Sequence, residues 1–219
     1  GESEVEFATR LTDELEARIL EEGPETVAAL FAEPVMAAGG VITPPETYFE
    51  KIQAVLKKYD VLLVADEVVC GFGRTGNMFA SETYDLKPDF MTLAKALSAS
   101  AAPISALMMT EEIYQGIHEK SDEIGIFGHG YTYSGHPMTA AVALETLQIY
   151  EDIDMLGHVR AVSPHFQKRL MALATHPLVG EARGVGLIGA LELVADKDSK
   201  TLFDPALRVG TRTNNACVE

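Results

Sequence analysis

The sequence predicts an α/β fold, and three observations support that prediction. Short apolar runs alternate with segments whose apolar residues recur at helical spacing. The apolar runs lack polar alternation, which is typical of strands in a sheet covered on both faces. Glycine, proline or helix-capping residues stand at several of the changes from one pattern to the other.

The first predicted helix covers residues 3–22. Ser3 and Glu6 form a capping-box pattern at its start, and apolar residues follow along one face. Gly23-Pro24 ends it. The sequence therefore contains both a start signal and a stop signal for this helix.

Further helices and the strands follow in alternation. Pro44-Pro45 precedes a helix with an apolar face over residues 48–59, and another helix begins at Thr110 with an acidic first turn. Four apolar runs are predicted strands, over residues 27–32, 61–65, 90–94 and 104–109. Together these elements predict a sheet with helical crossovers.

The character of the chain changes near residues 152–156. Long helices are predicted over residues 137–150 and 154–174, and residues 185–195 alternate like a strand packed on one face. We therefore expect residues 1–153 to belong to a large α/β domain and residues 154–219 to begin a smaller α+β domain. Because the chain starts with Gly1 rather than Met, we expect it to be part of a longer protein.

Composition limits the classes of partner. The 219 residues hold 17 Lys and Arg against 33 Asp and Glu, a net charge of −16. Nucleic acid and anionic membrane surfaces are bound by clustered cations, so we expect neither as a partner, and no apolar run reaches the roughly 20 residues that cross a bilayer. Cys70 and Cys217 are too far apart in sequence to suggest a disulfide framework or a zinc site. We expect free thiols in a reducing cytoplasm, and no metal.

The stretch VLLVADEVVCGFGRTG, residues 61–76, resembles two nucleotide-binding patterns. Gly71, Gly73 and Gly76 spell G-x-G-x-x-G, but the dinucleotide fingerprint needs its first glycine directly after the strand and its third opening a helix. The apolar run ending in Asp66 resembles the metal-holding strand of a nucleotide triphosphatase, but no G-x-x-x-x-G-K-[ST] loop is present. Neither pattern has its required context.

Asp66 and Lys95 suggest a different site. Each ends a predicted strand, so both belong to the carboxyl edge of the sheet, where ligands of open α/β sheets sit. A lysine in a dry pocket can lose its charge and form a Schiff base, and a carboxylate can keep a pyridine nitrogen protonated. This pair is the minimum equipment for pyridoxal phosphate chemistry. The alternatives are a loop aspartate that bonds to backbone and a solvated surface lysine.

Five segments carry a resemblance to the class III aminotransferases, pyridoxal-phosphate enzymes of the aspartate-aminotransferase fold (fold type I). They cover residues 32–41, 61–79, 87–97, 128–137 and 183–188. The likeness is greatest to ω-transaminases that use pyruvate as amino acceptor. It implies the second half of the large domain and the start of the small domain.

The resemblance also implies residue roles. Lys95 would form the Schiff base with pyridoxal phosphate and shuttle the proton, and Asp66 would bind the pyridine nitrogen. Val69 would pack on the ring; by itself it is one more apolar residue. Thr132 would donate its hydroxyl to the cofactor phosphate of a neighbouring subunit, which implies a homodimer with shared sites. Glu33 would position side chains near the substrate.

Other noticeable residues receive structural interpretations. We expect Arg74 to shape its glycine-rich loop, and His129 and His136 to satisfy local hydrogen bonds. Leu107-Met108-Met109 is expected in the strand core. Relatives differ at Cys70, where they often have a small hydroxyl residue, and in residues 98–103.

The implied reaction is transfer of an amino group from an amine or ω-amino acid to a keto acid such as pyruvate. The phosphate cradle, the ring-stacking aromatic and the carboxylate-binding arginine of relatives are not found in these residues. An aminomutase or an amino acid decarboxylase would use the same Asp66 and Lys95. A truncated chain without catalysis is a third alternative.

Overall fold

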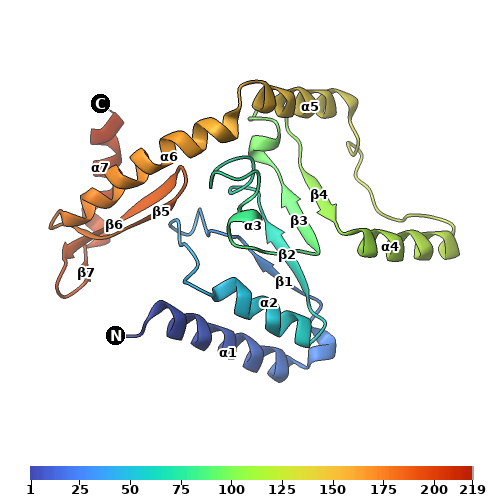
Figure 1. Cartoon of the computed structure of the whole chain (residues 1–219), viewed down its shortest axis with the longest axis horizontal. Coiled ribbons are helices and arrows are strands. Elements are labelled where there is room, and N and C mark those ends of the chain that lie inside the picture. Colours follow the sequence, from blue (N-terminus) through green and yellow to red (C-terminus); the bar gives the residue numbers. More distant parts are fainter. Residues whose placement is uncertain (219) are drawn as a thin grey trace.

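The computed structural model describes residues 1–218 and contains two separate sheets (Figure 1). The first has the order β1-β2-β3-β4. Its strands are β1 (Ala29–Ala32), β2 (Leu62–Asp66), β3 (Phe90–Leu93) and β4 (Ala106–Met109). β1, β2 and β3 are parallel, and β4 runs antiparallel to β3. The predicted α/β class is confirmed, with one antiparallel strand at the edge.

Two helices cover one face of this sheet. α1 (Glu4–Glu22) packs against α2 (Tyr48–Lys58), and Ile19 and Ile52 are buried with Leu63 of β2 in one cluster. The periodic apolar faces predicted from the sequence are the faces that make this core.

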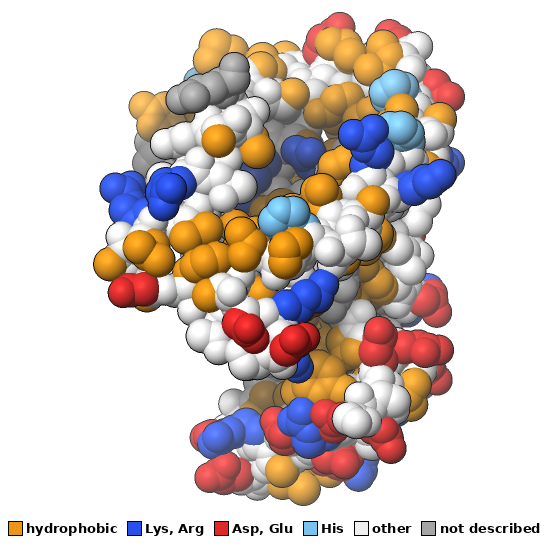
Figure 2. Space-filling view, turned by 90° about the vertical axis from the view of Figure 1, so that its left-hand side faces the viewer, with side chains coloured by type: hydrophobic (Ala, Val, Ile, Leu, Met, Phe, Trp, Pro, Cys, Tyr) orange, Lys and Arg blue, Asp and Glu red, His pale blue; other side chains and the backbone are white. Residues whose placement is uncertain are grey.

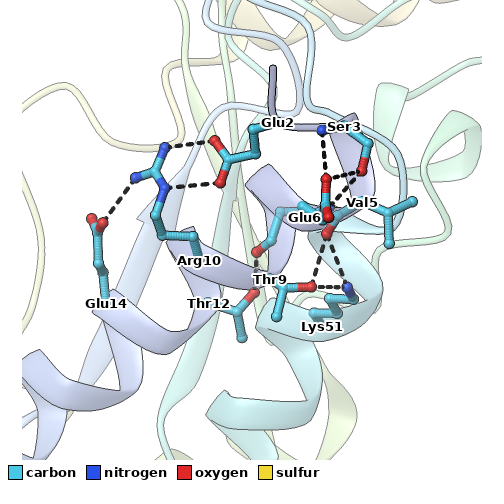
Figure 3. Close-up of polar contacts among 10 residues, drawn as sticks. Glu2, Ser3, Val5, Glu6, Thr9, Arg10, Thr12, Glu14 and Lys51 are labelled. Atoms are coloured by element: carbon cyan, nitrogen blue, oxygen red, sulfur yellow. Dashed lines mark hydrogen bonds and ion pairs between the residues drawn. The ribbon is translucent and has the colours of Figure 1, made fainter.

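The capping box at the start of α1 is present (Figure 3). The Ser3 hydroxyl accepts from the Glu6 amide at 3.3 Å, and the Glu6 carboxylate accepts from the Ser3 amide at 2.8 Å. Arg10 donates to both Glu2 and Glu14. Charged side chains of both signs are intermixed at the lower end of Figure 2, where α1 lies. α1 therefore exposes charged side chains to solvent and buries Ala8 and Ile19.

The rest of the sheet is less well covered by this chain. Phe31 of β1 is 70% exposed, Leu107 of β4 is 54% exposed and Met108 is 55% exposed. The prediction that Leu107-Met108-Met109 is strand core is therefore wrong for its first two residues. The reason is position, since β4 is an edge strand.

The chain then leaves the sheet along α4 (Glu111–Ile124) and returns through residues 125–136 to α5 (Pro137–Asp152). α5 packs over the end of β3, where Ala143 joins Phe72 and Leu97 in a buried cluster. Short pieces complete this part: α3 (Ala80–Thr83) and the 3-10 turns η1 (Pro24–Thr26) and η2 (Lys95–Leu97).

The second sheet is antiparallel and lies against α6 (Met155–Ala172). Its strands are β5 (Val179–Val185), β6 (Ile188–Asp196) and β7 (Thr201–Leu202). Two 3-10 turns, η3 (Leu173–Thr175) and η4 (Pro205–Leu207), and helix α7 (Val209–Val218) complete it. The expected division at 153/154 falls between α5 and α6 and stays a prediction. Within residues 1–218, no helix combines the length and apolarity that a membrane span requires.

Candidate active site

Asp66 and Lys95 lie at the carboxyl edge of the same sheet. Asp66 is the last residue of β2, and the register of the parallel β2–β3 pair places it opposite Thr92. Lys95 follows three positions after Thr92, at the start of η2. The strand ends thus carry a carboxylate and an amine on adjacent strands. Their roles stay predictions.

The Asp66 side chain is half-buried and has one free acceptor. One carboxylate oxygen accepts a hydrogen bond from the Val68 amide at 3.0 Å. Within residues 1–218 the second oxygen has no hydrogen-bond partner. The backbone bond matches the simpler interpretation of a loop aspartate, yet it leaves the carboxylate able to receive a cation.

Thr92 is a candidate site residue that sequence reasoning missed. Its hydroxyl oxygen is buried and has no partner in residues 1–218. Because Thr92 is opposite Asp66 in the register, the two side chains project from the same face of the sheet. A buried hydroxyl without a partner is costly, so it favours a polar group from outside these residues. Its position three residues before Lys95 was the available signal.

The backbone at Lys95 adopts an unusual conformation. Its φ is +45°, in the left-handed region that non-glycine residues seldom occupy. The Lys95 carbonyl accepts from the Ser98 amide at 3.2 Å, closing the turn directly after β3. The side chain is exposed, and its amine has no ion pair within residues 1–218. Such conformations persist where surrounding contacts hold them, and they cluster at functional sites.

Glu67, next to Asp66, is another residue that sequence reasoning missed. It is 0% exposed. Its carboxylate accepts from the Ser81 amide at 2.6 Å, the Ser81 hydroxyl at 2.7 Å and the Ala80 amide at 3.1 Å. Burial raises the pKa of Glu67, and the Ser81 and Ala80 bonds act in the opposite direction. Glu67 therefore ties the end of β2 to the start of α3.

The other predicted site residues are dispersed. Val69 is half-buried in the turn after Asp66, and Glu33 is half-buried after β1, where it accepts from the Ala37 amide at 3.1 Å. Thr132 is exposed on residues 125–136, which run along the outer edge of the molecule (Figure 1). This chain does not bring Thr132 to Asp66 and Lys95.

The two histidines of that segment depart from expectation. The Nδ1 atom of His136 is buried without a hydrogen-bond partner, so the prediction that it satisfies a local bond is wrong for that atom. The His129 ring lies between the rings of Phe127 and Tyr131, with centroids at 5.8 and 5.5 Å. The contacts recorded for the His129 side chain are therefore aromatic ones.

The glycine-rich loop after β2 contacts both α6 and the second sheet. Gly73 has φ +97°, and a β-carbon there would lie 2.8 Å from the Met155 methyl group of α6. The Arg74 carbonyl accepts from the Leu187 amide at 2.9 Å, in the turn between β5 and β6. The structural role expected for Arg74 thus resides in its backbone.

A second link between the sheets comes from Arg183 of β5. Its guanidinium donates to the Gly40 carbonyl at 2.9 Å and pairs with Glu192 at 3.1 Å. Gly40 belongs to the loop that follows Glu33. The second sheet is therefore attached to the loop after β1 as well as to the loop after β2.

Both cysteines of the described chain lack a disulfide partner. Cys70 is buried and free, with its thiol directed at the Val35 carbonyl, and Cys217 is exposed and free. Among residues 1–218, no group of three or more His, Cys, Asp or Glu side chains is arranged to hold a metal ion.

The chain matches known proteins along nearly its whole length. A family model described as aminotransferase class-III matches residues 2–217. Gamma aminobutyrate transaminase 1, mitochondrial, of Solanum lycopersicum is 53% identical over 217 residues, covering 99% of this chain and 42% of the relative. Probable gamma-aminobutyrate transaminase 4 of Oryza sativa subsp. japonica is 55% identical over 218 residues, covering 99% and 45%. The chain thus spans less than half the length of these curated relatives.

Solved structures agree. A structure described as a transaminase with L-Ala superposes with a TM-score of 0.95 at 57% identity, covering 98% of this chain and 51% of the other. The ω-transaminase from Pseudomonas jessenii in complex with PMP superposes with a TM-score of 0.91 at 52% identity, covering 93% and 45%.

Proposed function

This chain belongs to the class III aminotransferase family, and from that premise we propose that the complete protein moves an amino group from an amine or ω-amino acid to a keto acid such as pyruvate. Class III aminotransferases depend on pyridoxal phosphate. The observation that carries the proposal is the placement of Asp66 and Lys95 at the ends of adjacent parallel strands.

Three features of the described residues fit pyridoxal phosphate. Asp66 has a free carboxylate oxygen, and Thr92 has a buried hydroxyl without a partner on the same face of the sheet. The amine of Lys95 is unpaired within residues 1–218. When bound, the cofactor supplies a ring that withdraws electrons from the substrate carbon.

The residues have distinct proposed tasks. The Asp66 carboxylate would hold a proton on the pyridine nitrogen, because an opposite charge favours the charged form of its partner. The Lys95 amine would hold the cofactor through its carbonyl carbon, with release of water, and would act as the base that takes a proton from the substrate and as the acid that returns it. Val69 excludes water from one ring face. Glu33 positions groups near the substrate.

Two half-reactions follow from this scheme. The donor would give up its amino group and leave as a carbonyl compound whose oxygen comes from water, and the keto acid would then take the amino group and release its oxygen as water. Such an order gives ping-pong kinetics. Gamma-aminobutyrate in the names of relatives supports an ω-amino acid donor.

The test uses the full-length protein loaded with pyridoxal phosphate. Alanine formed from pyruvate and an amine is measured for the wild type, for Lys95→Ala and for Lys87→Ala, an exposed lysine eight positions earlier. We expect alanine from the wild type and Lys87→Ala only. If cofactor binds but no amine yields alanine, while carbon dioxide or a shifted amino group appears, the decarboxylase or aminomutase replaces this proposal.

We further propose a homodimer whose sites are shared through Thr132. The segment that carries Thr132 lies away from the sheet, and its neighbours Tyr131 and Tyr133 are 78% and 79% exposed, which supports a second copy as its partner. The Lys95→Ala and Thr132→Ala proteins, each expected to be inactive alone, are mixed and allowed to exchange subunits. If sites are shared, the mixed dimer has one intact site and activity returns. If each site lies within one subunit, the mixture stays inactive.

We also propose a cytoplasmic location. Two thiols without a disulfide support a reducing compartment. Fractionation of cells that produce the protein, followed by detection with an antibody, tests this; recovery only in an organelle or the medium would contradict it.

A further inference from the structure

The turn that carries Lys95 has a hydrogen bond from a distant element. The hydroxyl of Tyr150, on α5, donates to the Ala96 carbonyl at 2.7 Å. Ala96 is the residue after Lys95 in the turn η2. The contact therefore joins the turn to a helix that starts more than 40 residues later.

The other hydrogen bonds around this turn are local. The Leu97 amide donates to the Ala94 carbonyl at 3.0 Å, and the Ser98 amide donates to the Lys95 carbonyl at 3.2 Å. Local bonds preserve the shape of the turn but do not fix its place in the molecule. The bond from Tyr150 does help to fix it, together with the packing of Leu97 against Ala143, because α5 is a separate packed element.

Tyr150 is itself well placed to act as an anchor. It packs against the cluster of Phe72, Leu97 and Ala143 beneath the turn. Burial raises the pKa of Tyr150, and the charge of Arg74 acts in the opposite direction with a smaller effect, so the hydroxyl remains a donor at neutral pH. The left-handed backbone at Lys95 needs such an outside constraint, because it costs free energy that the turn alone does not recover.

We propose that Tyr150 is a positioning residue for Lys95. Its hydroxyl holds η2 against α5, and so keeps the lysine amine where it can bond the cofactor. This inference rests on the proposed function, in which Lys95 carries that bond. Tyr150 touches no reacting atom, and its effect passes through the Ala96 carbonyl.

The experiment compares two single-atom deletions in the full-length protein. Tyr150→Phe removes the hydroxyl, and the Ala96 carbonyl keeps its bond from the Ala99 amide at 3.2 Å, so the variant should fold. Tyr59→Phe is the matched control: the half-buried hydroxyl of Tyr59, the residue after α2, also makes a 2.7 Å bond, to Glu16 of α1. Pyridoxal phosphate is titrated into each apoprotein, and the visible absorbance of Lys95-bound cofactor is followed.

We expect the apparent dissociation constant of the cofactor to rise about fivefold in Tyr150→Phe and to stay unchanged in Tyr59→Phe. A fivefold change corresponds to the net free energy of one ordinary hydrogen bond. Amide hydrogen exchange in the apoproteins should quicken over residues 95–100 in Tyr150→Phe alone. Equal cofactor affinity in Tyr150→Phe and the wild type, or an equal loss in both variants, would overturn the inference. If the wild type itself gives no Lys95-bound cofactor, the proposed function fails instead, whereas the exchange result still tests the anchor.

Discussion

The carboxylate of Asp66 and the hydroxyl of Thr92 leave the sheet on the same face, because the two residues are opposite each other in the parallel β2–β3 register. The Thr92 hydroxyl is buried without a partner in residues 1–218. A polar atom in this condition lowers the stability of the chain that carries it. It is retained at little cost only if something else supplies its partner.

Thr92→Val should therefore raise the stability of the apoprotein and lower its affinity for the cofactor. Valine removes the unpartnered hydroxyl, so we expect the free energy of unfolding of the apoprotein to rise by about 1 kcal/mol. Cofactor affinity should fall by about fivefold, since the hydroxyl's outside partner is lost. Chemical denaturation and cofactor titration measure the two effects. Thr83→Val is the control, because the Thr83 hydroxyl is bonded to Thr75 at 2.8 Å and its loss should destabilise. A destabilised Thr92→Val protein would contradict this account.

Glu67 should contribute more to stability than a surface carboxylate does. Glu67→Ala leaves the Ala80 and Ser81 donors without their acceptor in a buried place, so we expect a loss of about 3 kcal/mol or more in the free energy of unfolding. Ser81→Ala removes only the hydroxyl bond of 2.7 Å and should cost about 1 kcal/mol. Denaturant titration of both variants provides the measurement. Similar small losses in both would show that Glu67 is not the anchor of this loop.

Elements with their own start and stop signals could be predicted from the sequence. The capping box of Ser3 and Glu6 located α1, and the apolar run before Asp66 located β2. β5 could not be predicted, because its exposed Glu181 and half-buried Arg183 break the alternation and its pairing with β6 decides its state. α3 has only four residues, too few to form a periodic pattern.

The candidate site divides in the same way. Asp66 and Lys95 were identified because each stands at the end of a predicted strand. Thr92 could be identified only from the strand register, which places it opposite Asp66, 26 positions earlier. Glu67 could be identified only from the folded loop, which brings Ser81, 14 positions later, into hydrogen-bond contact with it. Their importance depends on burial and on partners, and neither quantity is visible in the order of residues.

Cys70 should be inert and should make stability depend on alkaline pH. Burial, reinforced by Glu67 and other nearby carboxylates, raises the pKa of the Cys70 thiol to about 11. At pH 8 an alkylating reagent should modify the peptide that contains exposed Cys217 and spare the one that contains Cys70. Peptide mapping by mass spectrometry tests this, and alkylation of Cys70 at a comparable rate would refute the buried-thiol description.

The sign of the pH effect follows from the same shift. The folded chain keeps the Cys70 proton up to about pH 11, whereas the unfolded chain loses it above an ordinary thiol pKa of 9.0. Stability should therefore fall as pH rises through this window, by about 2–3 kcal/mol in full. Cys70→Ser should remove that part of the decline, and Cys217→Ser should not. Identical pH dependence of the free energy of unfolding in the two serine variants would contradict the prediction.

Gly186 should be required for the close packing of the second sheet against the glycine-rich loop. It has φ +58°, and a β-carbon there would lie 2.3 Å from the Arg74 carbonyl oxygen and 2.6 Å from the Thr75 α-carbon. Both are backbone atoms, which cannot rotate away. Gly186→Ala should therefore lower the free energy of unfolding by about 2–4 kcal/mol, from backbone strain and overpacking together.

Gly125→Ala isolates the conformational part of that loss. Gly125 has φ +79° at the end of α4, but nothing lies within 4 Å of the position of its β-carbon. We expect a cost of about 1 kcal/mol there, because only the left-handed backbone is penalised. Thermal unfolding gives both values, and hydrogen exchange over β5 and β6 should quicken in Gly186→Ala alone. Equal losses would mean that the close approach to Arg74 adds nothing, and the glycine would then be explained by its backbone angle.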